Sequence, residues 1–173
     1  MTFVALLHAV NLGARRKVPM ADLRALLTGL GLREVRTYIQ SGNAVFSADP
    51  DPTLRGRLEA ALEAQFGFPV PVTLRTAPEW QEAATGCPAH LRSEAVVVAF
   101  LRDPPAPERV EARRARNVTP ERWEIVGQTL YQTVPDGVRT MKLSAAVIER
   151  VLGVGVTVRN ERTVQAIAAL LDT

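Results

Sequence analysis

The sequence predicts an α+β fold built from two tandem ferredoxin-like βαββαβ units, with one further helix closing the chain. Three observations predict this fold. Short apolar runs of strand length alternate with segments whose leucines recur at helical spacing. The order strand, helix, two strands, helix, strand occurs once in each half, and each half carries a turn motif between its two adjacent strands. We therefore expect one unit over residues 1–90 and a second over residues 91–173.

In the first half, local signals mark each element in turn. An almost unbroken apolar run predicts a buried first strand, and Pro19 suits the first position of a helix that Gly29 and Gly31 end. The segment 40–43 has hairpin composition, and Pro52 can open the next helix. The expected elements are strand 2–10, helix 19–30, strands 35–39 and 44–47, helix 52–66, strand 70–74 and helix 78–84.

The second half repeats this order, with a turn at Gly127-Gln128 between its paired strands. The expected elements are strand 95–101, helix 107–116, strands 123–126 and 129–134, helix 144–152, strand 154–158 and the closing helix 163–171. One continuous mixed sheet over all strands is the alternative arrangement. The first strand of each half is apolar at odd and even positions alike. This pattern predicts that both faces are covered, either by the other half or by a second subunit in a homodimer.

The charge balance argues against nucleic acid as a partner. The chain has 21 basic and 18 acidic residues, and its two halves carry net charges of +1 and +2. Neither half therefore has the concentrated basic excess that a nucleic-acid footprint needs. The densest basic run, over residues 109–116, is interleaved with glutamates and is expected to be a solvated helix face.

Other features of the composition exclude further classes. No apolar run reaches the length of a membrane span, so we expect no membrane partner. The single cysteine, Cys87, cannot form an internal disulfide, and with only two histidines beside it the chain lacks the usual zinc spacings. We therefore expect a cytoplasmic protein without a metal or a cofactor.

Two groups of loop residues combine glycines, amides and cations near the start of helices. In the first half, the loop after the first strand and the tip of the hairpin share one edge of a split βαβ sheet. Exposed backbone N–H groups and the positive end of a helix dipole favour an anion at such an edge. The expected ligand-binding residues there are Asn11, Gly13, Lys17, Gln40, Ser41 and Asn43.

In the second half, the corresponding group lies at the opposite edge, where the third and fourth strands end. Its expected ligand-binding residues are Lys142, Arg159 and Asn160, with Arg139 beside them. Lys17 and Lys142 are the only lysines among 21 basic residues, and both lie in loops that lead into a helix. Structural roles stay open for both groups, because the segment 41–43 is ordinary turn composition and Asn160 is a good N-cap.

Several motifs along the chain form a recognisable set. They are Val4 to Gly13, Lys17 to Arg24, Val35 to Phe46, Pro135-Asp136-Gly137, Lys142-Leu143 and Thr157 to Asn160. In these motifs the sequence resembles an uncharacterised bacterial family, the domain of unknown function 1697. The resemblance implies the α+β fold and the same loops, and it implies no particular activity because the family has none assigned. The sequence departs from the family's pattern at His8, Ala14, Arg139, Met141 and Glu161.

These features favour a binding module for a small ligand that is anionic or carries phosphate. An enzyme acting on such a ligand is the first alternative, in which Lys17 or Lys142 would stabilise charge. Ser41 or His8 would then transfer a proton.

Two further alternatives do not involve a small ligand. Single-stranded RNA could stack on Phe3 and Phe46 of the sheet, although the aromatic content of the chain is only 5%. A dimeric adaptor protein is the other alternative, and the apolar strands favour it.

Overall fold

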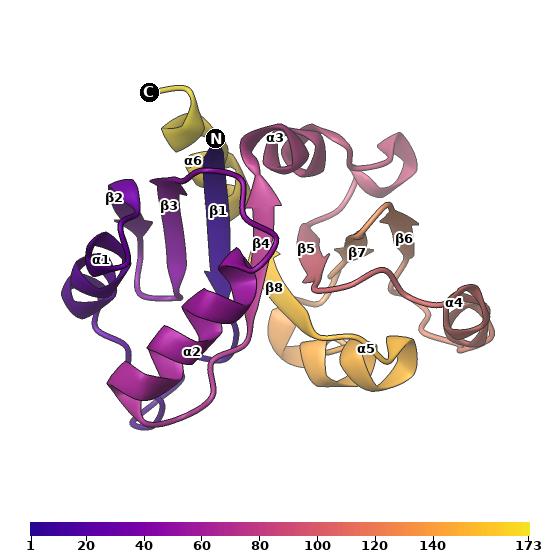
Figure 1. The fold of residues 1–173 in the computed structure, drawn as a ribbon. Helices are drawn as coiled ribbons and strands as arrows, with labels where there is room; N and C mark the ends of the chain where they lie inside the picture. The colour runs from indigo at the N-terminus through magenta and orange to yellow at the C-terminus, as the bar shows by residue number, and fades with distance from the viewer. The chain divides into compact units, whose positions relative to one another are not determined.

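The computed structural model describes residues 1–173 and has a mixed α+β fold with two four-stranded antiparallel sheets and six α-helices (Figure 1). The chain forms two compact units, Met1–Gln81 with Ile167–Thr173, and Glu82–Ala166. This division falls between residues 81 and 82, whereas the sequence pattern places it after residue 90. Two separate sheets form instead of the alternative continuous sheet, because each first strand pairs only with strands of its own half.

In the first unit the strand order is β2-β3-β1-β4, and all neighbouring strands are antiparallel. β1 and β2 therefore run parallel with β3 between them, so the end of β1 and the β2–β3 turn lie at one edge of the sheet. α1 and α2 cover one face of this sheet (Figure 1). The elements are β1 (Thr2–Leu7), α1 (Met20–Gly29), β2 (Arg33–Tyr38), β3 (Asn43–Ser47), α2 (Leu54–Phe66), β4 (Val72–Thr76) and then α3 (Ala77–Thr85).

The second unit has the same arrangement, with the strand order β6-β7-β5-β8 and antiparallel neighbours throughout. Two short 3-10 helices, at Ala89–Leu91 and Val138–Thr140, lie before β5 and after β7. The other elements are β5 (Val96–Leu101), α4 (Pro107–Arg114), β6 (Trp123–Val126), β7 (Thr129–Thr133), α5 (Ala145–Leu152), β8 (Val156–Asn160) and α6 (Glu161–Leu171).

The first strand is shorter than the apolar run that predicts it. β1 ends at Leu7 rather than at Val10, because Ala9 lies in the left-handed region with φ 52° and cannot continue a strand. Val10 is nevertheless buried in the core. The loop that precedes α1 therefore starts earlier than the sequence predicts, and its first residues are anchored by burial.

Each unit has its own core beneath its helices. In the first unit, Leu23 and Leu27 of α1 and Leu58 and Leu62 of α2 share a core with Phe46 of β3. The spacing of four residues within each pair places both leucines on one helix face, and burying each leucine stabilises the fold by about 1.5–3 kcal/mol. The core of the second unit includes Ala99, Leu130, Ile148 and Leu152.

β1 is buried on both faces, as its apolar sequence predicts. Ala5 and Leu7 belong to the core on the helix side of the sheet. Val4 and Leu6 point to the opposite face and are fully buried there. β5 is likewise buried along its whole length.

Candidate functional site

The loop between β1 and α1 distinguishes the two units. It spans twelve residues, whereas the corresponding loop between β5 and α4 spans five. The backbone beside the two loops is bonded in the same way: Leu7 N–H donates to Gly42 O at 2.8 Å, and Leu101 N–H donates to Gln128 O at 3.0 Å. Long loops on a rigid scaffold commonly carry function. The β1–α1 loop is therefore the main candidate site.

Asn11 fixes this loop from within. Its side-chain Oδ1 accepts a hydrogen bond from Val18 N–H at 2.8 Å, and its Nδ2 donates to Val18 O at 2.8 Å. The same Nδ2 donates to Gln40 O at 2.7 Å, which joins the loop to the β2–β3 turn. The structure thus brings the two predicted loops together, with Asn11 as the connecting residue. The Asn11 side chain is used for this framework.

Arg16 fixes the other side of the loop. Its Nε donates to Ala9 O at 2.8 Å, its Nη2 donates to Pro69 O at 2.7 Å, and its guanidinium lies 4.8 Å from the centre of the Phe68 ring. Arg16 O also accepts a hydrogen bond from Asn11 N–H at 3.0 Å. Arg16 therefore has a structural role, and its neighbours Arg15 and Lys17 differ from it in this respect.

The β2–β3 turn packs tightly against the start of the loop. Gly42 has φ +82°, and a Cβ added there would lie 2.7 Å from Val10 Cγ2 and 2.9 Å from Leu7 Cβ. Asn43 is fully buried, and its Nδ2 donates to Tyr38 O at 2.9 Å and to Ser41 Oγ at 2.8 Å. Asn43 and Ser41 therefore hold the turn together, which is the structural role that their turn composition allows.

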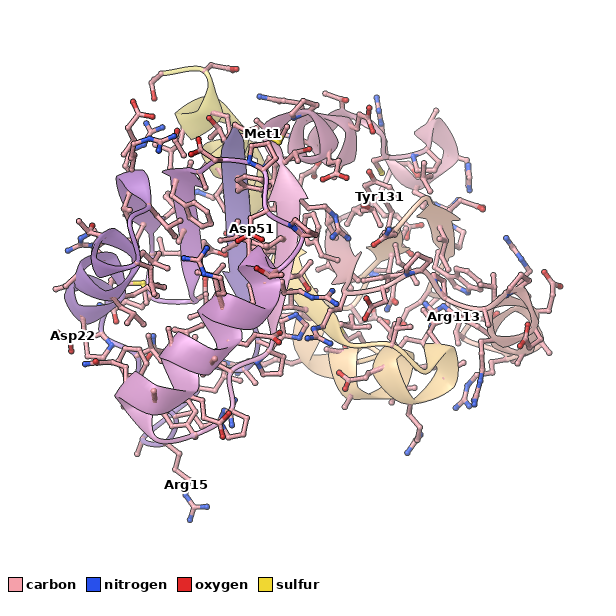
Figure 2. The ribbon with its side chains drawn as sticks, in the orientation of Figure 1. Met1, Arg15, Asp22, Asp51, Arg113 and Tyr131 are labelled. Atoms are coloured by element: carbon pink, nitrogen blue, oxygen red, sulfur yellow. The ribbon has the colours of Figure 1, made fainter.

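Two cations of the loop have no intramolecular partner. Arg15 and Lys17 are exposed, and neither forms an ion pair or a hydrogen bond. The Arg15 side chain extends away from the protein (Figure 2). Gln40 is also exposed, with its backbone carbonyl bonded to Asn11 and its side-chain amide without a partner. These three polar side chains are the ones that can reach a ligand.

The start of α1 adds backbone donors beside these cations. The N-cap of α1 is Pro19, which provides no side-chain cap, so the N–H groups of the first turn lack a side-chain acceptor. Gly13 has φ +73° and open space around its Cα, so a ligand can approach the backbone there. Asp22 lies in the first turn of α1, and its carboxylate would repel an anion bound directly at the helix axis.

Backbone strain is concentrated at this edge of the sheet. Of the five non-glycine residues with positive φ in the chain, four lie in the loop or directly before the turn: Ala9, Asn11, Arg16 and Ile39. Residues of this kind cost free energy and cluster at binding and catalytic sites. The sequence shows no sign of this strain except at Asn11, because asparagine is the only residue of the four that favours the left-handed region.

The second predicted group is engaged in the fold. Lys142 Nζ donates to Thr119 O. Arg159 is buried, where its Nη1 donates to Thr157 Oγ1 at 2.7 Å and to Val158 O at 3.0 Å, and burial lowers its pKa to about 10. Asn160 Oδ1 accepts a hydrogen bond from Thr163 N–H at 2.8 Å and so caps α6. Arg139 is exposed in the second 3-10 helix.

Lys142 and Arg159 are not brought together. Successive residues of β5 pair with Gln132 and Arg159, so these two side chains point to opposite faces of the sheet. The Glu121 carboxylate accepts hydrogen bonds from the Gln132 side chain and from the Lys142 backbone N–H. Lys142 is therefore held on the Gln132 side of the sheet, and Arg159 lies on the other side.

Arg113 is a buried charge that the sequence pattern does not predict, and the expected solvated helix face over 109–116 is wrong at this residue. Arg113 is fully buried, with its guanidinium 4.3 Å from the centre of the Trp123 ring. Its Nη2 donates to Gln132 Oε1 at 3.3 Å, while its Nε and Nη1 have no partner. Burial lowers the pKa of Arg113 to about 10, against the nearby Glu121 carboxylate, which raises it.

The signal for Arg113 is its helical spacing. Val110 packs against the core of the second unit, and Arg113 follows it by three residues on the same face of α4. Apart from this spacing, the sequence around Arg113 gives no sign that it is buried, because the residue lies in the densest basic run of the chain.

The residues proposed for the alternative functions are also placed inside the first unit. His8 is buried, with its Nε2 2.7 Å from Thr73 Oγ1. Phe3 and Phe46 stack on each other with ring centres 6.0 Å apart and belong to the core on the helix side of the sheet. The pair is thus not the exposed stacking platform that single-stranded RNA binding needs.

The fold and this loop define the class of protein: an α+β protein of two similarly arranged four-stranded antiparallel sheets, with an extended, strained loop on the first. Residues 1–131 match the family described as "Protein of unknown function (DUF1697)", and the chain belongs to that family. The resemblance seen in the sequence is confirmed. The matched residues include the β1–α1 loop and the β2–β3 turn, and they end before Lys142.

Comparison with solved structures supports the fold. The conserved bacterial protein SP0830 from Streptococcus pneumoniae is 23% identical, with 98% of each chain covered and a TM-score of 0.79, so the two chains share a fold. An unknown protein from Galdieria sulphuraria is 14% identical over 92% of this chain and 96% of its own, and its TM-score of 0.26 is too low to indicate a shared fold. No curated protein matches the chain. None of the helices is both long enough and apolar enough to cross a membrane.

Proposed function

We propose that the protein is a binding module for a small anionic ligand of the phosphate or carboxylate class, held at the β1–α1 loop. The observation that carries the proposal is the contrast among the three consecutive cations of the loop. Arg16 is bonded within the protein through its Nε and Nη2, whereas Arg15 and Lys17 on either side of it are exposed and unpaired. Arg15 and Lys17 supply the positive charge, and the exposed Gln40 side chain supplies a neutral donor from the neighbouring turn.

The rigidity of the loop supports this function. Asn11 and Arg16 hold the backbone through five side-chain hydrogen bonds, to Val18, Gln40, Ala9 and Pro69. A loop that is ordered before binding loses less conformational entropy when the ligand arrives. Ala9, Asn11 and Arg16 already have their strained backbone conformations in the free protein, so binding does not need to impose this strain.

The second predicted group is not part of the proposed site. Lys142, Arg159 and Asn160 each have an intramolecular partner, and an anion would have to replace those bonds. The second unit also lacks a long loop at the edge that corresponds to the site of the first unit. The binding function is therefore assigned to the first unit alone, with Lys17 as the lysine that contacts the ligand.

Binding is tested on the full chain with inorganic pyrophosphate as the probe. A thermal unfolding shift is measured in sodium pyrophosphate and in sodium chloride of equal ionic strength, which separates binding from general screening. A ligand at 100 times its Kd stabilises the folded state by about 2.7 kcal/mol. We expect Lys17→Ala and Arg15→Ala to remove most of the shift. Arg150→Ala, which changes an exposed cation on α5, is the matched control and is expected to leave the shift unchanged. Equal shifts in the two salts would overturn the proposal, and so would a shift that the loop variants leave intact.

Two further assignments accompany this function. The identical strand orders of the two units support our proposal that both are ferredoxin-like. The free thiol of Cys87 supports placement in the cytoplasm, since reduced cysteines persist there. The homodimer stays a prediction, which sedimentation velocity tests.

A further inference from the structure

We propose that the anion bound by the β1–α1 loop belongs to an anionic membrane surface, on which the protein docks by inserting Leu12 and Ile39 among the lipid headgroups. This inference rests on the proposed function and names its ligand. It departs from the sequence expectation of no membrane partner, which is based on the lack of a spanning segment and does not bear on attachment to a membrane surface. The first observation is exposure: Leu12 is 73% exposed and Ile39 is 51% exposed, although both are large apolar side chains. The Asn11–Gln40 hydrogen bond joins the two segments, so both side chains lie at the same edge of the sheet.

Ile39 is the more informative of the two. It has φ 48°, in the left-handed region that is unfavourable for an L-residue and most unfavourable for a β-branched one. Burial does not offset this cost, because half of the side chain remains in water. Asparagine or glycine would suit this backbone better. An apolar side chain in this position is explained if it is buried against something outside the chain.

The charges beside these side chains select the partner. Arg15 and Lys17 are exposed and unpaired within a few residues of Leu12, and Arg16 is held back by its bonds to Ala9 and Pro69. Proteins that lie on anionic lipid bury apolar side chains at the headgroup boundary and use nearby Lys and Arg to attract the lipid charge. Each Lys or Arg side chain near such a surface contributes about 1 kcal/mol of electrostatic attraction to it. Two cations and two aliphatic side chains give weak, reversible and salt-dependent attachment.

A lipid surface fits the shape of this edge better than a soluble ligand or a folded partner does. A free phosphate would contact the cations and leave Leu12 and Ile39 in water. Two grooves on the first unit lie elsewhere, one of about 510 Å³ beside β2, β3 and the C-terminal residues and one of about 420 Å³ between α1 and α2. Neither groove is lined by Leu12 or Ile39. Two separate, exposed apolar side chains suit a deformable surface.

The test measures binding of the full chain to sedimented vesicles of phosphatidylcholine with and without phosphatidylglycerol. We expect binding only to the vesicles with phosphatidylglycerol, and a decrease as salt rises. The double variant Leu12→Ser with Ile39→Asn removes both apolar side chains and places at residue 39 a residue that tolerates its backbone. We expect about tenfold weaker vesicle binding, a pyrophosphate shift like that of the wild type, and thermal stability equal to or above the wild type.

A matched control isolates the role of position. Val126 is 47% exposed at the corresponding hairpin of the second unit, so Val126→Ser removes a similar apolar side chain elsewhere. We expect this variant to bind the vesicles as the wild type does. Equal loss of vesicle binding in both variants would overturn the inference, because it would show that removing any exposed apolar side chain weakens binding.

Three other outcomes also overturn the inference. If the protein binds neutral vesicles as strongly as anionic ones, Arg15 and Lys17 do not contribute to binding. A pyrophosphate shift without vesicle binding overturns the lipid surface and leaves the anion site of the proposed function intact, whereas absence of both overturns the two together. A sedimentation velocity experiment in which the double variant dissociates a wild-type dimer would assign Leu12 and Ile39 to contact between two copies.

Discussion

Asn11 Nδ2 donates to the backbone carbonyl of Gln40 at 2.7 Å, across 29 residues of sequence. This bond holds the β1–α1 loop and the β2–β3 turn at one edge of the sheet. The sheet brings the two segments near each other, since β1 and β2 are parallel and flank β3. The asparagine then fixes their separation, and the proposed site relies on this by using the cations of the loop together with the amide of Gln40.

Asn11→Ala is expected to destabilise the fold by about 2–3 kcal/mol, because it removes three hydrogen bonds whose net contribution is about 0.5–1.5 kcal/mol each. It also leaves a non-glycine residue at φ 56°. Asn11→Gly removes the same amide and relieves the backbone, so it separates the two effects. Urea unfolding measures both variants. If Asn11→Ala is as stable as the wild type, the amide does not hold the loop.

Gly42→Ala is expected to cost about 2–4 kcal/mol, because the new Cβ would overlap Val10 and Leu7 in addition to adopting φ +82°. Gly13→Ala is the matched control, since Gly13 has φ +73° and no atom within 4 Å of an added Cβ. Only the conformational cost of about 1 kcal/mol applies there. Equal losses of unfolding free energy in the two variants would contradict the close packing of the turn on β1.

The buried cluster of Arg113, Gln132 and Glu121 predicts an asymmetry between two substitutions. Glu121→Leu is expected to destabilise by about 3 kcal/mol or more, because it leaves the buried Arg113 charge uncompensated and removes the acceptor of Lys142 N–H and Gln132 Nε2. Arg113→Met is expected to cost less than about 1.5 kcal/mol, since it removes a charge with two unpaired nitrogens, Nε and Nη1, and keeps an apolar side chain beside Trp123. Chemical denaturation of both variants measures the order, and the reverse order would refute it.

Tyr131 predicts a loss of stability at high pH. Its hydroxyl donates to Ala83 O at 2.7 Å, and burial raises its pKa to about 12 from the ordinary value of 10.0. Between pH 10 and pH 12 the unfolded chain loses this proton while the folded chain keeps it, so the stability contributed by the neutral hydroxyl decreases as pH rises.

Tyr131→Phe isolates this titration from those of the other alkaline groups. The variant is expected to be less stable than the wild type at neutral pH, because it leaves the Ala83 carbonyl without its donor. The difference between the two proteins should then shrink as the pH rises from 10 to 12. Thermal unfolding at pH 8, 10 and 11.5 measures the difference, and a constant difference would exclude Tyr131 as the titrating group.

Much of the local structure follows from the order of the residues. The leucine spacing of α1 and α2, the hairpin turn before Asn43 and the cap at Asn160 all depend on neighbours within a few positions. Such signals are present in the sequence itself. They account for the order of the strands and helices and for the proximity of the two loops of the first unit, which the parallel course of β1 and β2 requires.

The tertiary structure decided what the individual polar residues do. Arg15, Arg16 and Lys17 are three adjacent cations in the sequence, and only the positions of Ala9, Pro69 and Phe68 assign Arg16 to the framework. Whether a side chain is bonded or free depends on acceptors that lie far away along the chain, and the local sequence pattern does not indicate where these acceptors are. The sequence by itself determined the α+β fold class and the proximity of the two loops of the first unit. Long-range packing determined that Arg113 is buried, that Lys142 and Arg159 are separated, and that Lys17, Arg15, Leu12 and Ile39 remain exposed.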